Sequence, residues 1–449
     1  MRAVNLIEQP QTEAVPTTEK NPSIWRRVRR DFAVLGAGSL GIVLAQLAFR
    51  SILIVVLVPA EYGRLSLVLS VYNTAMLIGV SGLPDTAARY ISLHGAHSDA
   101  AIVRAAVRAA AWPTVVASAV MAGVAGVILQ SPVAAVAGAI GLAGMVFSLL
   151  SLGILRGRRR LLPAAAIMPA AAATEVLLLA TAWKSGISIS GDLAFGFFCF
   201  GNVVSVSLAA VFIYRTRPRG FGEGHGEVFR PSVRELLGFS LWLTTATVGI
   251  AAMPLIMRFA AAFDSYTVVG TVDVALVLLS LPQRVGSVIV SAVIPHASRD
   301  SAAGRIGVTI SRREHLYLGL PFVAAAAVIA FTPLVEVAFD AIGRPAYAAS
   351  ADYLALALLA SPARVLYGLV QGVLTGHGEG KFLAANAMAV TVTASCLIFA
   401  IAAAGSIVGA FAVFVAACWI VYLNALRRIH RIAQSRPAAL ATEVPVPAG

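Results

Sequence analysis

Four arginines lie inside segments that are otherwise apolar and long enough to cross a membrane. They are Arg50, Arg258, Arg284 and Arg364. An ionisable side chain in such a segment costs about 2.5–3.5 kcal/mol on insertion scales, so each one needs a compensating environment. Because a guanidinium group does not lose its charge, three environments are open: an ion pair, reach to the headgroups, or a water-filled cavity.

The depth of each arginine separates these explanations. At about 1.5 Å per residue, Arg284 and Arg364 lie within about 5 Å of the midplane of their segments, too deep for easy reach to the surface. A cavity-facing position is therefore favoured for both. Arg50 lies in the outer half of its segment, and Arg258 lies nearer the interface, where an ion pair or headgroup contact explains it equally well.

Two carboxylates also lie within apolar segments. Glu175 is near the middle of one segment, and Asp273 is near the outer start of another. Either can form an ion pair with an arginine. A buried carboxyl can instead take up a proton or bind sodium, so both are candidates for ion pairing or for coupling transport to an ion gradient.

Prolines precede three of the four arginines, at Pro254, Pro282 and Pro362. Proline inside a helix removes one backbone hydrogen bond and bends the helix. The three positions are candidate hinges, although proline is also common in ordinary transmembrane helices.

The elements that hold these residues are predicted by composition. With 59% hydrophobic and 12% charged residues, the 449-residue chain has too little polar surface for a soluble globule. Apolar runs of 18 or more residues predict about twelve transmembrane helices. They fall near residues 33–58, 65–84, 109–129, 132–155, 162–183, 192–214, 237–262, 267–294, 316–339, 350–374, 382–403 and 405–426.

The basic residues predict topology. When the loops alternate from a cytoplasmic N-terminus, most of the 34 Lys and Arg residues fall on one side. The net charge of +13 then indicates orientation rather than nucleic-acid binding, and both termini are expected in the cytoplasm of a bacterium, with the chain in its inner membrane. Cys199, Cys396 and Cys418 show no spacing typical of a metal site or a disulfide framework.

The chain repeats itself. Arg50 precedes Gly63 by 13 residues and Arg258 precedes Gly270 by 12, while the motif GILRG at 153–157 returns as GVLTG at 372–376. Glycine in that motif allows a tight turn or close helix approach. We therefore predict an all-α polytopic membrane protein with two six-helix bundles related by a pseudo-two-fold axis along the membrane normal. The expected parts are a cytoplasmic tail (1–31), an N-terminal bundle (32–214), a cytoplasmic linker (215–235), a C-terminal bundle (236–431) and a disordered tail (432–449).

Several motifs carry a resemblance to a known family. They are the turn PAEYGRLSL (59–67), GLPDTAARYIS (82–92), VVG…VIPHASR (268–299), LTGHGEGK (374–381) and GSIVGAFAVFVA (405–416). The chain resembles the polysaccharide-biosynthesis oligosaccharide flippases of the multidrug/oligosaccharidyl-lipid/polysaccharide (MATE-like) superfamily over residues 24–431. This resemblance implies two bundles around a central cavity, alternating access, and transport of a polyprenyl-linked glycan to the outer leaflet, with no enzymatic activity, cofactor or metal.

The implied cargo explains the arginines. A lipid-linked oligosaccharide carries one or two phosphates, and guanidinium groups contact phosphate oxygens in two-point hydrogen bonds. Arg50, Arg284 and Arg364, with Arg258 as a further candidate, are then the expected binding residues. Besides this substrate, the expected partners are membrane lipids and the glycosyltransferases and polymerase of a polysaccharide pathway, and a monomer is expected.

Three alternatives remain. A cation-coupled small-molecule exporter of the same superfamily is disfavoured because several cavity arginines would repel cationic drugs. A membrane glycosyltransferase is disfavoured because the outer loops are short and contain only isolated acids. A scaffold in a polysaccharide-assembly complex is compatible with the sequence.

Overall fold

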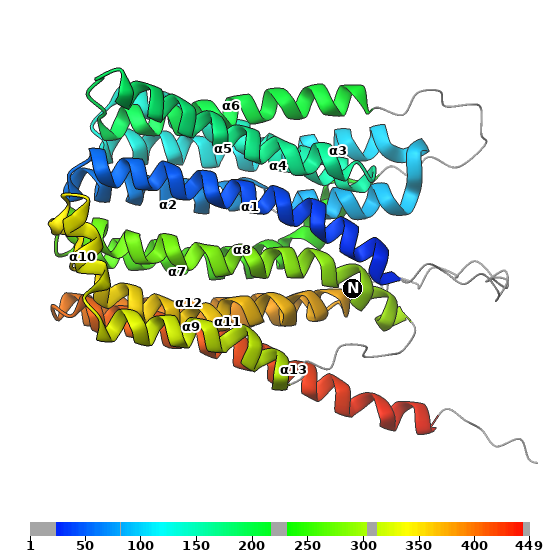
Figure 1. Cartoon of the computed structure of the whole chain (residues 1–449). Coiled ribbons are helices and arrows are strands. Elements are labelled where there is room, and N and C mark those ends of the chain that lie inside the picture. Colours follow the sequence, from blue (N-terminus) through cyan, green and yellow to red (C-terminus); the bar gives the residue numbers. More distant parts are fainter. Residues whose placement is uncertain (1–23, 81, 217–230, 303–311, 443–449) are drawn as a thin grey trace, which may run out of the picture.

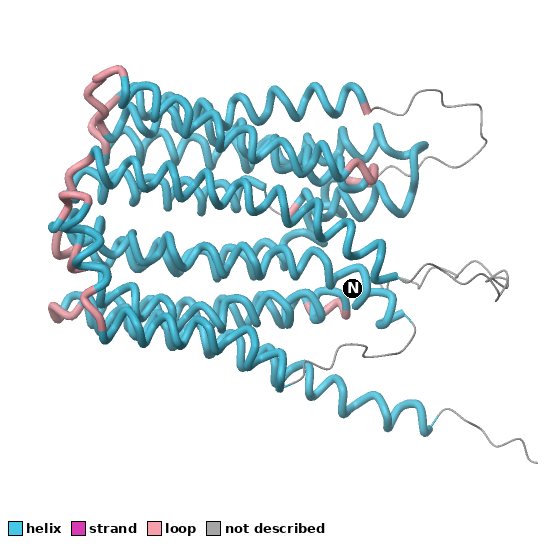
Figure 2. Tube along the Cα trace, viewed as in Figure 1, coloured by secondary structure: helices cyan, strands magenta, loops and turns pink. Residues whose placement is uncertain are grey.

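The structure, a computed structural model, describes residues 24–80, 82–216, 231–302 and 312–442. Throughout these ranges the regular elements are helices and no strand occurs (Figure 2). The helices are α1 (Ile24–Val56), α2 (Pro59–Val80), α3 (Leu83–Ile128), α4 (Pro132–Gly157), α5 (Leu161–Lys184), α6 (Gly191–Arg215), α7 (Val233–Ala262), α8 (Tyr266–Ala302), α9 (Arg312–Phe331), α10 (Leu334–Ala341), the 3-10 helix η1 (Pro345–Tyr347), α11 (Ser350–Gly376), α12 (Gly380–Ala403) and α13 (Ile407–Thr442). The predicted all-α class is confirmed.

The number of membrane spans also agrees with the prediction. In the described part of the chain, 11 helices are long and apolar enough to cross a membrane, and α9 with α10 makes a twelfth if the pair is one span. The predicted continuous span at 316–339 is wrong, because α9 and α10 meet at an angle of 71°. Pro333 has no N–H to continue the helix, and the Thr332 hydroxyl donates to the Val328 carbonyl at 2.6 Å.

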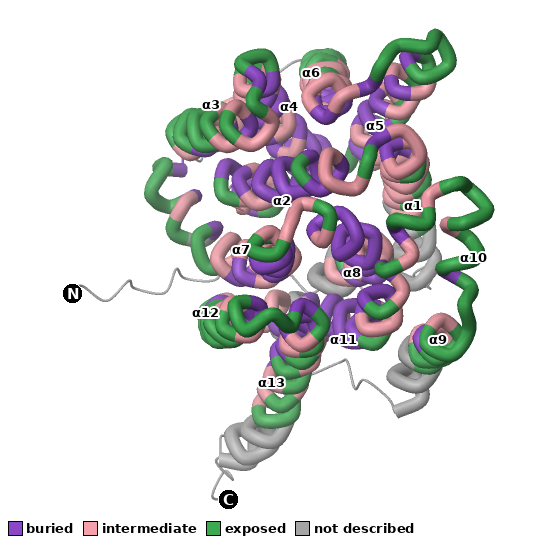
Figure 3. Tube along the Cα trace, turned by 90° about the vertical axis from the view of Figure 1, so that its left-hand side faces the viewer, coloured by how far each residue is buried: buried purple, intermediate pink, exposed green. Residues whose placement is uncertain are grey.

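The helices form two halves that lie side by side. Seen end-on in Figure 3, α1–α6 gather on one side and α7–α13 on the other, and α2, α7 and α8 meet at the seam between them. We call the end where α1 meets α2 and α7 meets α8 the turn end (Figure 1, left), and the end where α1 begins the basic end. One continuous core of buried side chains, including Tyr62 and Leu65 of α2 and Val269 and Val272 of α8, joins the halves.

Local sequence explains where several helices begin and end. Ser131 caps α4 by accepting from Ala134 N at 3.3 Å, and Ser232 and Glu235 form a reciprocal capping box at the start of α7. Between α11 and α12, Gly378 adopts a φ of 81°, which an L side chain rarely tolerates. The expected tight turn after the GVLTG motif is therefore present.

Other predicted boundaries need correction. The segment Pro59–Gly63, predicted as a turn, is the first turn of α2, and the chain breaks at Leu57 and Val58 instead. Proline at the first helical position and Glu61 in the first turn both favour a helix N-terminus. α1 already begins at Ile24, inside the predicted tail, and α13 continues to Thr442, beyond the predicted end of the second bundle. Residues 1–23, 217–230 and 443–449, which belong to the predicted tails and linker, lie outside the described residues.

Glycines bring neighbouring helices into close contact within each half. A Cβ on Gly153 of α4 would collide with the Pro84 carbonyl of α3, and a Cβ on Gly368 of α11 would lie 2.5 Å from the Gly286 carbonyl of α8. Backbones that approach this closely exclude any larger residue. The close helix approach predicted for the glycine motif is present at Gly153.

Candidate functional site at the seam between the halves

The turn end of the seam holds a buried charge cluster made by Arg50, Tyr62, Arg258 and Asp273. Asp273 is completely buried; its Oδ2 accepts from Arg50 Nη1 at 3.0 Å and from the Tyr62 hydroxyl at 2.6 Å. Its Oδ1 accepts from Arg258 Nε at 2.7 Å and also from Arg258 Nη2. Two guanidinium groups therefore share one carboxylate, and one positive charge is left over.

The repeat explains why these residues meet. Arg50 lies near the end of α1 and Arg258 near the end of α7, which are the leading helices of the two halves. Tyr62 is the fourth residue of α2 and Asp273 is the eighth residue of α8, the helices that follow. Docking of the halves brings all four residues together. Arg258 is further held by its own helix, because its Nη1 donates to the Pro254 carbonyl at 3.2 Å.

Reciprocal glycine contacts close the seam at this level. A Cβ on Gly63 of α2 would collide with the Tyr266 carbonyl of α8, and a Cβ on Gly270 of α8 would lie 2.5 Å from the Pro59 carbonyl of α2. The glycine of α2 thus packs against the first turn of α8, and the glycine of α8 packs against the first turn of α2. Since the hydrogen bonds of Arg50 and Tyr62 to Asp273 also cross the seam, the turn end is closed in this structure.

The segment after α10 covers the cluster from the turn end. Arg344 Nη2 donates to the Val55 carbonyl near the end of α1. The Tyr347 ring stands edge-on to Tyr62, with centroids 6.0 Å apart, and stacks on Phe339 at 5.7 Å. Burial raises the pKa of Tyr347 above its ordinary value, so this phenol stays neutral at physiological pH.

Glu175 provides a second carboxylate near Arg50, in the same half as Arg50. It lies on α5 with 6% of its surface exposed, and a Cβ on Gly201 of α6 would lie 2.8 Å from its Oε1. Arg50 and Glu175 are close enough for their charges to attract each other. Arg50 therefore has one carboxylate in the other half, Asp273, and another in its own half.

The two arginines predicted near the midplane point in different directions. Arg284 of α8 reaches across the seam, and its Nη2 lies 3.4 Å from Gln46 Oε1 of α1. Arg364 of α11 instead lies inside the second half, with 6% of its surface exposed. The predicted group of binding arginines is therefore split between the charge cluster, the seam at Gln46, and the interior of one half.

Proline chemistry explains the position of Arg364. Because Pro254 has no N–H, the carbonyl of Ile250 one turn earlier loses its helical partner, and Arg364 Nη1 approaches that oxygen at 3.5 Å. The guanidinium also lies over the Phe414 ring, 5.6 Å from its centroid. Among the described atoms, its Nε and Nη2 have no hydrogen-bond partner although both are buried.

Comparison with known proteins assigns the chain to a family. Residues 28–300 match the family model described as "polysaccharide biosynthesis protein". This match covers more than half of the chain. The chain belongs to the polysaccharide biosynthesis protein family. A comparison with curated proteins gave no significant match.

Solved structures show that this family member has the fold of MATE transporters. The inward-facing form of a multidrug resistance MATE transporter of the MOP superfamily aligns at TM-score 0.65 and 15% identity, over 92% of this chain and 100% of that one. A MOP superfamily transporter from Pyrococcus furiosus, whose reversed pocket polarity suggests a different function, aligns at 0.63 and 15%, over 90% and 96%. The lipid II flippase MurJ, in an inward closed conformation, aligns at 0.59 and 12%, over 91% and 93%.

These findings confirm the predicted relationship and the two-lobed helical fold. The proteins that the chain resembles are transporters and flippases rather than enzymes. Sequence reasoning selected Arg50, Arg258 and Asp273 one by one, but it missed Tyr62, which completes the cluster. The available signal was the position of Tyr62 beside Gly63 in the repeated motif. Pro254, Pro282 and Pro362 lie within α7, α8 and α11, and their action as hinges stays a prediction.

Removal of the Tyr62 hydroxyl is expected to destabilise this family member. Tyr62→Phe deletes a buried hydrogen bond to a charged acceptor, which is worth about 1.5–3 kcal/mol. Thermal unfolding of the purified protein in detergent measures the effect. The matched control is Tyr347→Phe, because the buried Tyr347 hydroxyl has no partner among the described atoms and its loss should be neutral. Equal melting temperatures for the two variants would contradict the expected contribution of Tyr62.

Proposed function

We propose that this protein flips a polyprenyl-phosphate-linked oligosaccharide, a precursor of a cell-surface polysaccharide, from the inner to the outer leaflet of the bacterial cytoplasmic membrane. It acts as a monomer by alternating access, with both termini in the cytoplasm. The substrate is made and used by the glycosyltransferases and polymerase of the same pathway. Membership of the polysaccharide biosynthesis family supports the substrate class, and the transporter fold supports the mode of action.

The observation that carries the proposal is the unneutralised charge of Arg284 and Arg364. In the described part of the chain, neither residue forms an ion pair with a carboxylate. The two arginines lie at a similar depth along their helices. A Cβ on Gly286, two residues after Arg284 on α8, would lie only 3.0 Å from the backbone carbonyl of Arg364 on α11. Two permanent charges held at membrane depth without counter-ions favour a ligand that is itself anionic.

A phosphate group would supply these two arginines with a negative charge and with further hydrogen-bond acceptors. Its oxygens accept two-point hydrogen bonds from guanidinium forks, and its negative charge offsets theirs. The Nε and Nη2 of Arg364 form such a fork, and both donors are free of protein partners among the described atoms. Cationic drugs would be repelled by the same charges, which weighs against a small-molecule exporter.

The charge cluster serves as the gate at the turn end, which faces the outside in this proposal. Opening the seam would separate Arg50 and Tyr62 from Asp273, because these hydrogen bonds join opposite halves. Arg258 would keep Asp273, since α7 and α8 belong to the same half. Arg50 could then pair with Glu175 in its own half, which makes Glu175 the proposed coupling residue, with its protonation deciding whether that pair forms.

The proposal predicts loss of transport when either free guanidinium is removed. Arg284→Ala and Arg364→Ala are each expected to lower the rate at which lipid-linked glycan becomes exposed at the outer leaflet by about tenfold or more, the equivalent of one charged hydrogen bond. Exposure is measured in cells by labelling the glycan with an impermeant reagent. Arg104→Ala is the control, because Arg104 is exposed on α3 and bonds only within its own helix among the contacts seen.

Expression and transport must be compared together. Normal membrane levels with full transport in both Arg284→Ala and Arg364→Ala would remove the proposed substrate site. Arg364→Lys separates charge from geometry, because lysine retains the charge but cannot form the fork. Partial transport in this variant, against none in Arg364→Ala, is the expected result.

A further inference from the structure

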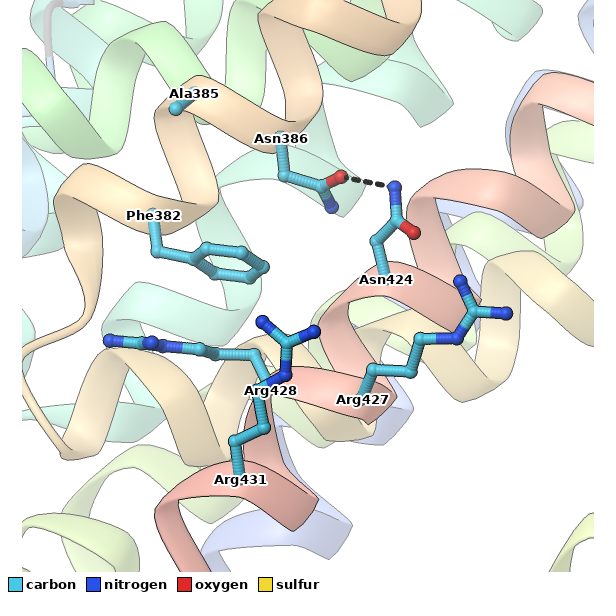
Figure 4. A pocket seen from close by; sticks show the side chains of 7 residues that line it. All are labelled: Phe382, Ala385, Asn386, Asn424, Arg427, Arg428 and Arg431. Atoms are coloured by element: carbon cyan, nitrogen blue, oxygen red, sulfur yellow. Dashed lines mark hydrogen bonds between the residues drawn. The ribbon is translucent and has the colours of Figure 1, made fainter. Parts of the chain in front are cut away.

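A pocket of about 330 Å³ opens between α12 and α13, well apart from the charge cluster. Figure 4 shows the amides of Asn386 and Asn424 on one side of it and arginines of α13 on the other. Asn424 Nδ2 donates to Asn386 Oδ1 at 3.1 Å, and Asn386 Nδ2 donates to the Val421 carbonyl at 3.0 Å. The amide side of the pocket is therefore held rigidly by hydrogen bonds between the two helices.

The arginine side carries excess positive charge. Arg428 is neutralised by Glu379, with Nε–Oε2 at 3.2 Å and Nη2–Oε2 at 3.0 Å, and it lies over Phe382 at 5.5 Å from the ring centroid. Arg427 and Arg431 are exposed, and no ion pair within the described ranges includes either one. Because they are four residues apart, they lie on the same face of α13. The pocket thus presents two free guanidinium forks.

An apolar surface continues from the pocket toward the turn end. Ile420 lies one turn from Asn424 on α13, and Val392 lies two turns after the pocket residue Ala385 on α12; both are exposed. Exposed apolar side chains along a membrane span are covered by hydrocarbon chains. A cationic pocket joined to such a surface matches an amphiphile with an anionic head, whereas a soluble anion would need the pocket alone.

We propose that this pocket binds the headgroup phosphate of an anionic phospholipid, whose acyl chains lie along the exposed apolar side chains of α12 and α13. Arg427 and Arg431 supply the two-point contacts to the phosphate oxygens. Arg428 and Phe382 shape the pocket, since their side chains are already engaged. The inference does not rest on the proposed substrate, because neither Arg284 nor Arg364 lines this pocket.

Native mass spectrometry of the purified full-length chain tests the proposal. Phosphatidylglycerol, phosphatidylcholine and inorganic diphosphate are titrated separately, and wild type is expected to retain phosphatidylglycerol best. Arg427→Gln with Arg431→Gln should weaken phosphatidylglycerol binding by about 30-fold, the effect of two basic side chains near a headgroup. The double lysine variant at these positions should fall between the two, because it keeps the charge and loses the forks.

The matched control replaces two other exposed arginines with the same spacing. Arg104→Gln with Arg108→Gln on α3 removes the same charge from another helix and should leave phosphatidylglycerol binding unchanged. An equal loss in both double variants would overturn the proposal, since general basicity would then explain the binding. Unchanged binding in the Arg427 and Arg431 variant would overturn it too. So would diphosphate binding at these arginines that phosphatidylglycerol fails to displace.

Discussion

Asp273→Asn is expected to destabilise the protein more than any other single change in the charge cluster. The substitution keeps the side-chain shape but removes the carboxylate charge that the buried Arg258 and the partly buried Arg50 share. Breaking a buried ion pair from one side costs about 3–5 kcal/mol, and here two guanidinium groups lose the same partner. Thermal unfolding of the purified protein in detergent should show a large drop in melting temperature, and transport should be lost.

The matched control is an Asp→Asn substitution in an exposed ion pair. Asp85→Asn removes an ion pair with Arg156 whose atoms are 3.7 Å apart and whose carboxylate is 61% exposed, so its cost should be about 0–1 kcal/mol. In addition, Arg258→Met with Asp273→Leu should recover part of the lost stability, because it removes one buried charge together with its partner. If Asp273→Asn unfolds at the same temperature as Asp85→Asn, the cluster is not a stabilising element.

Gly63→Ala and Gly270→Ala are each expected to hold the turn end open. The added methyl group would overlap a main-chain carbonyl of the opposite half, which cannot move aside as a side chain can. Overpacking of this kind costs about 1–3 kcal/mol, which would shift the balance between closed and open seams by about 5- to 150-fold. Spin labels at the exposed positions Arg64 and Asp264 should report longer distances, and transport should fall.

A third glycine separates this effect from helix propensity. Gly196 lies in the second turn of α6, and a Cβ built on it meets nothing within 4 Å. Alanine there should preserve both the label distance and transport, and it should favour the helix slightly. Wild-type label distances in Gly63→Ala and Gly270→Ala would show that the reciprocal contacts do not control closure.

The fold was largely predictable because a membrane span must satisfy its backbone hydrogen bonds within one helix and must present apolar side chains to lipid. Each span is therefore visible in the sequence as a long apolar run. Lipid does not constrain helix ends in this way, and the start of α2 was misplaced. Pro59 and Gly63 are typical turn residues, but Pro59 begins α2 and Gly63 packs α2 against α8. The break between α9 and α10 was missed for a similar reason, since hydropathy continues across Thr332 and Pro333.

The site was predictable in its members but not in its pairing. A charged residue in an apolar helix is conspicuous, so Arg50, Arg258 and Asp273 could each be found from the sequence. Which of them touch depends on how the two halves dock. A rotation of α11 about its axis decides whether Arg364 faces the seam or the Phe414 ring, and the sequence does not fix that rotation.

The break between α9 and α10 also indicates how deep the charge cluster lies in the membrane. Helix ends leave backbone groups without partners, and such groups need water or headgroups, so the break marks an edge of the hydrocarbon layer. Phe331, exposed by 88%, would enter that edge. Arg344, just beyond α10, reaches the Val55 carbonyl, which places Val55 near the same edge. Arg50 then lies about 7 Å further in, little more than one helical turn. At this depth the closed seam keeps water out, and a small separation of the halves is enough to admit it.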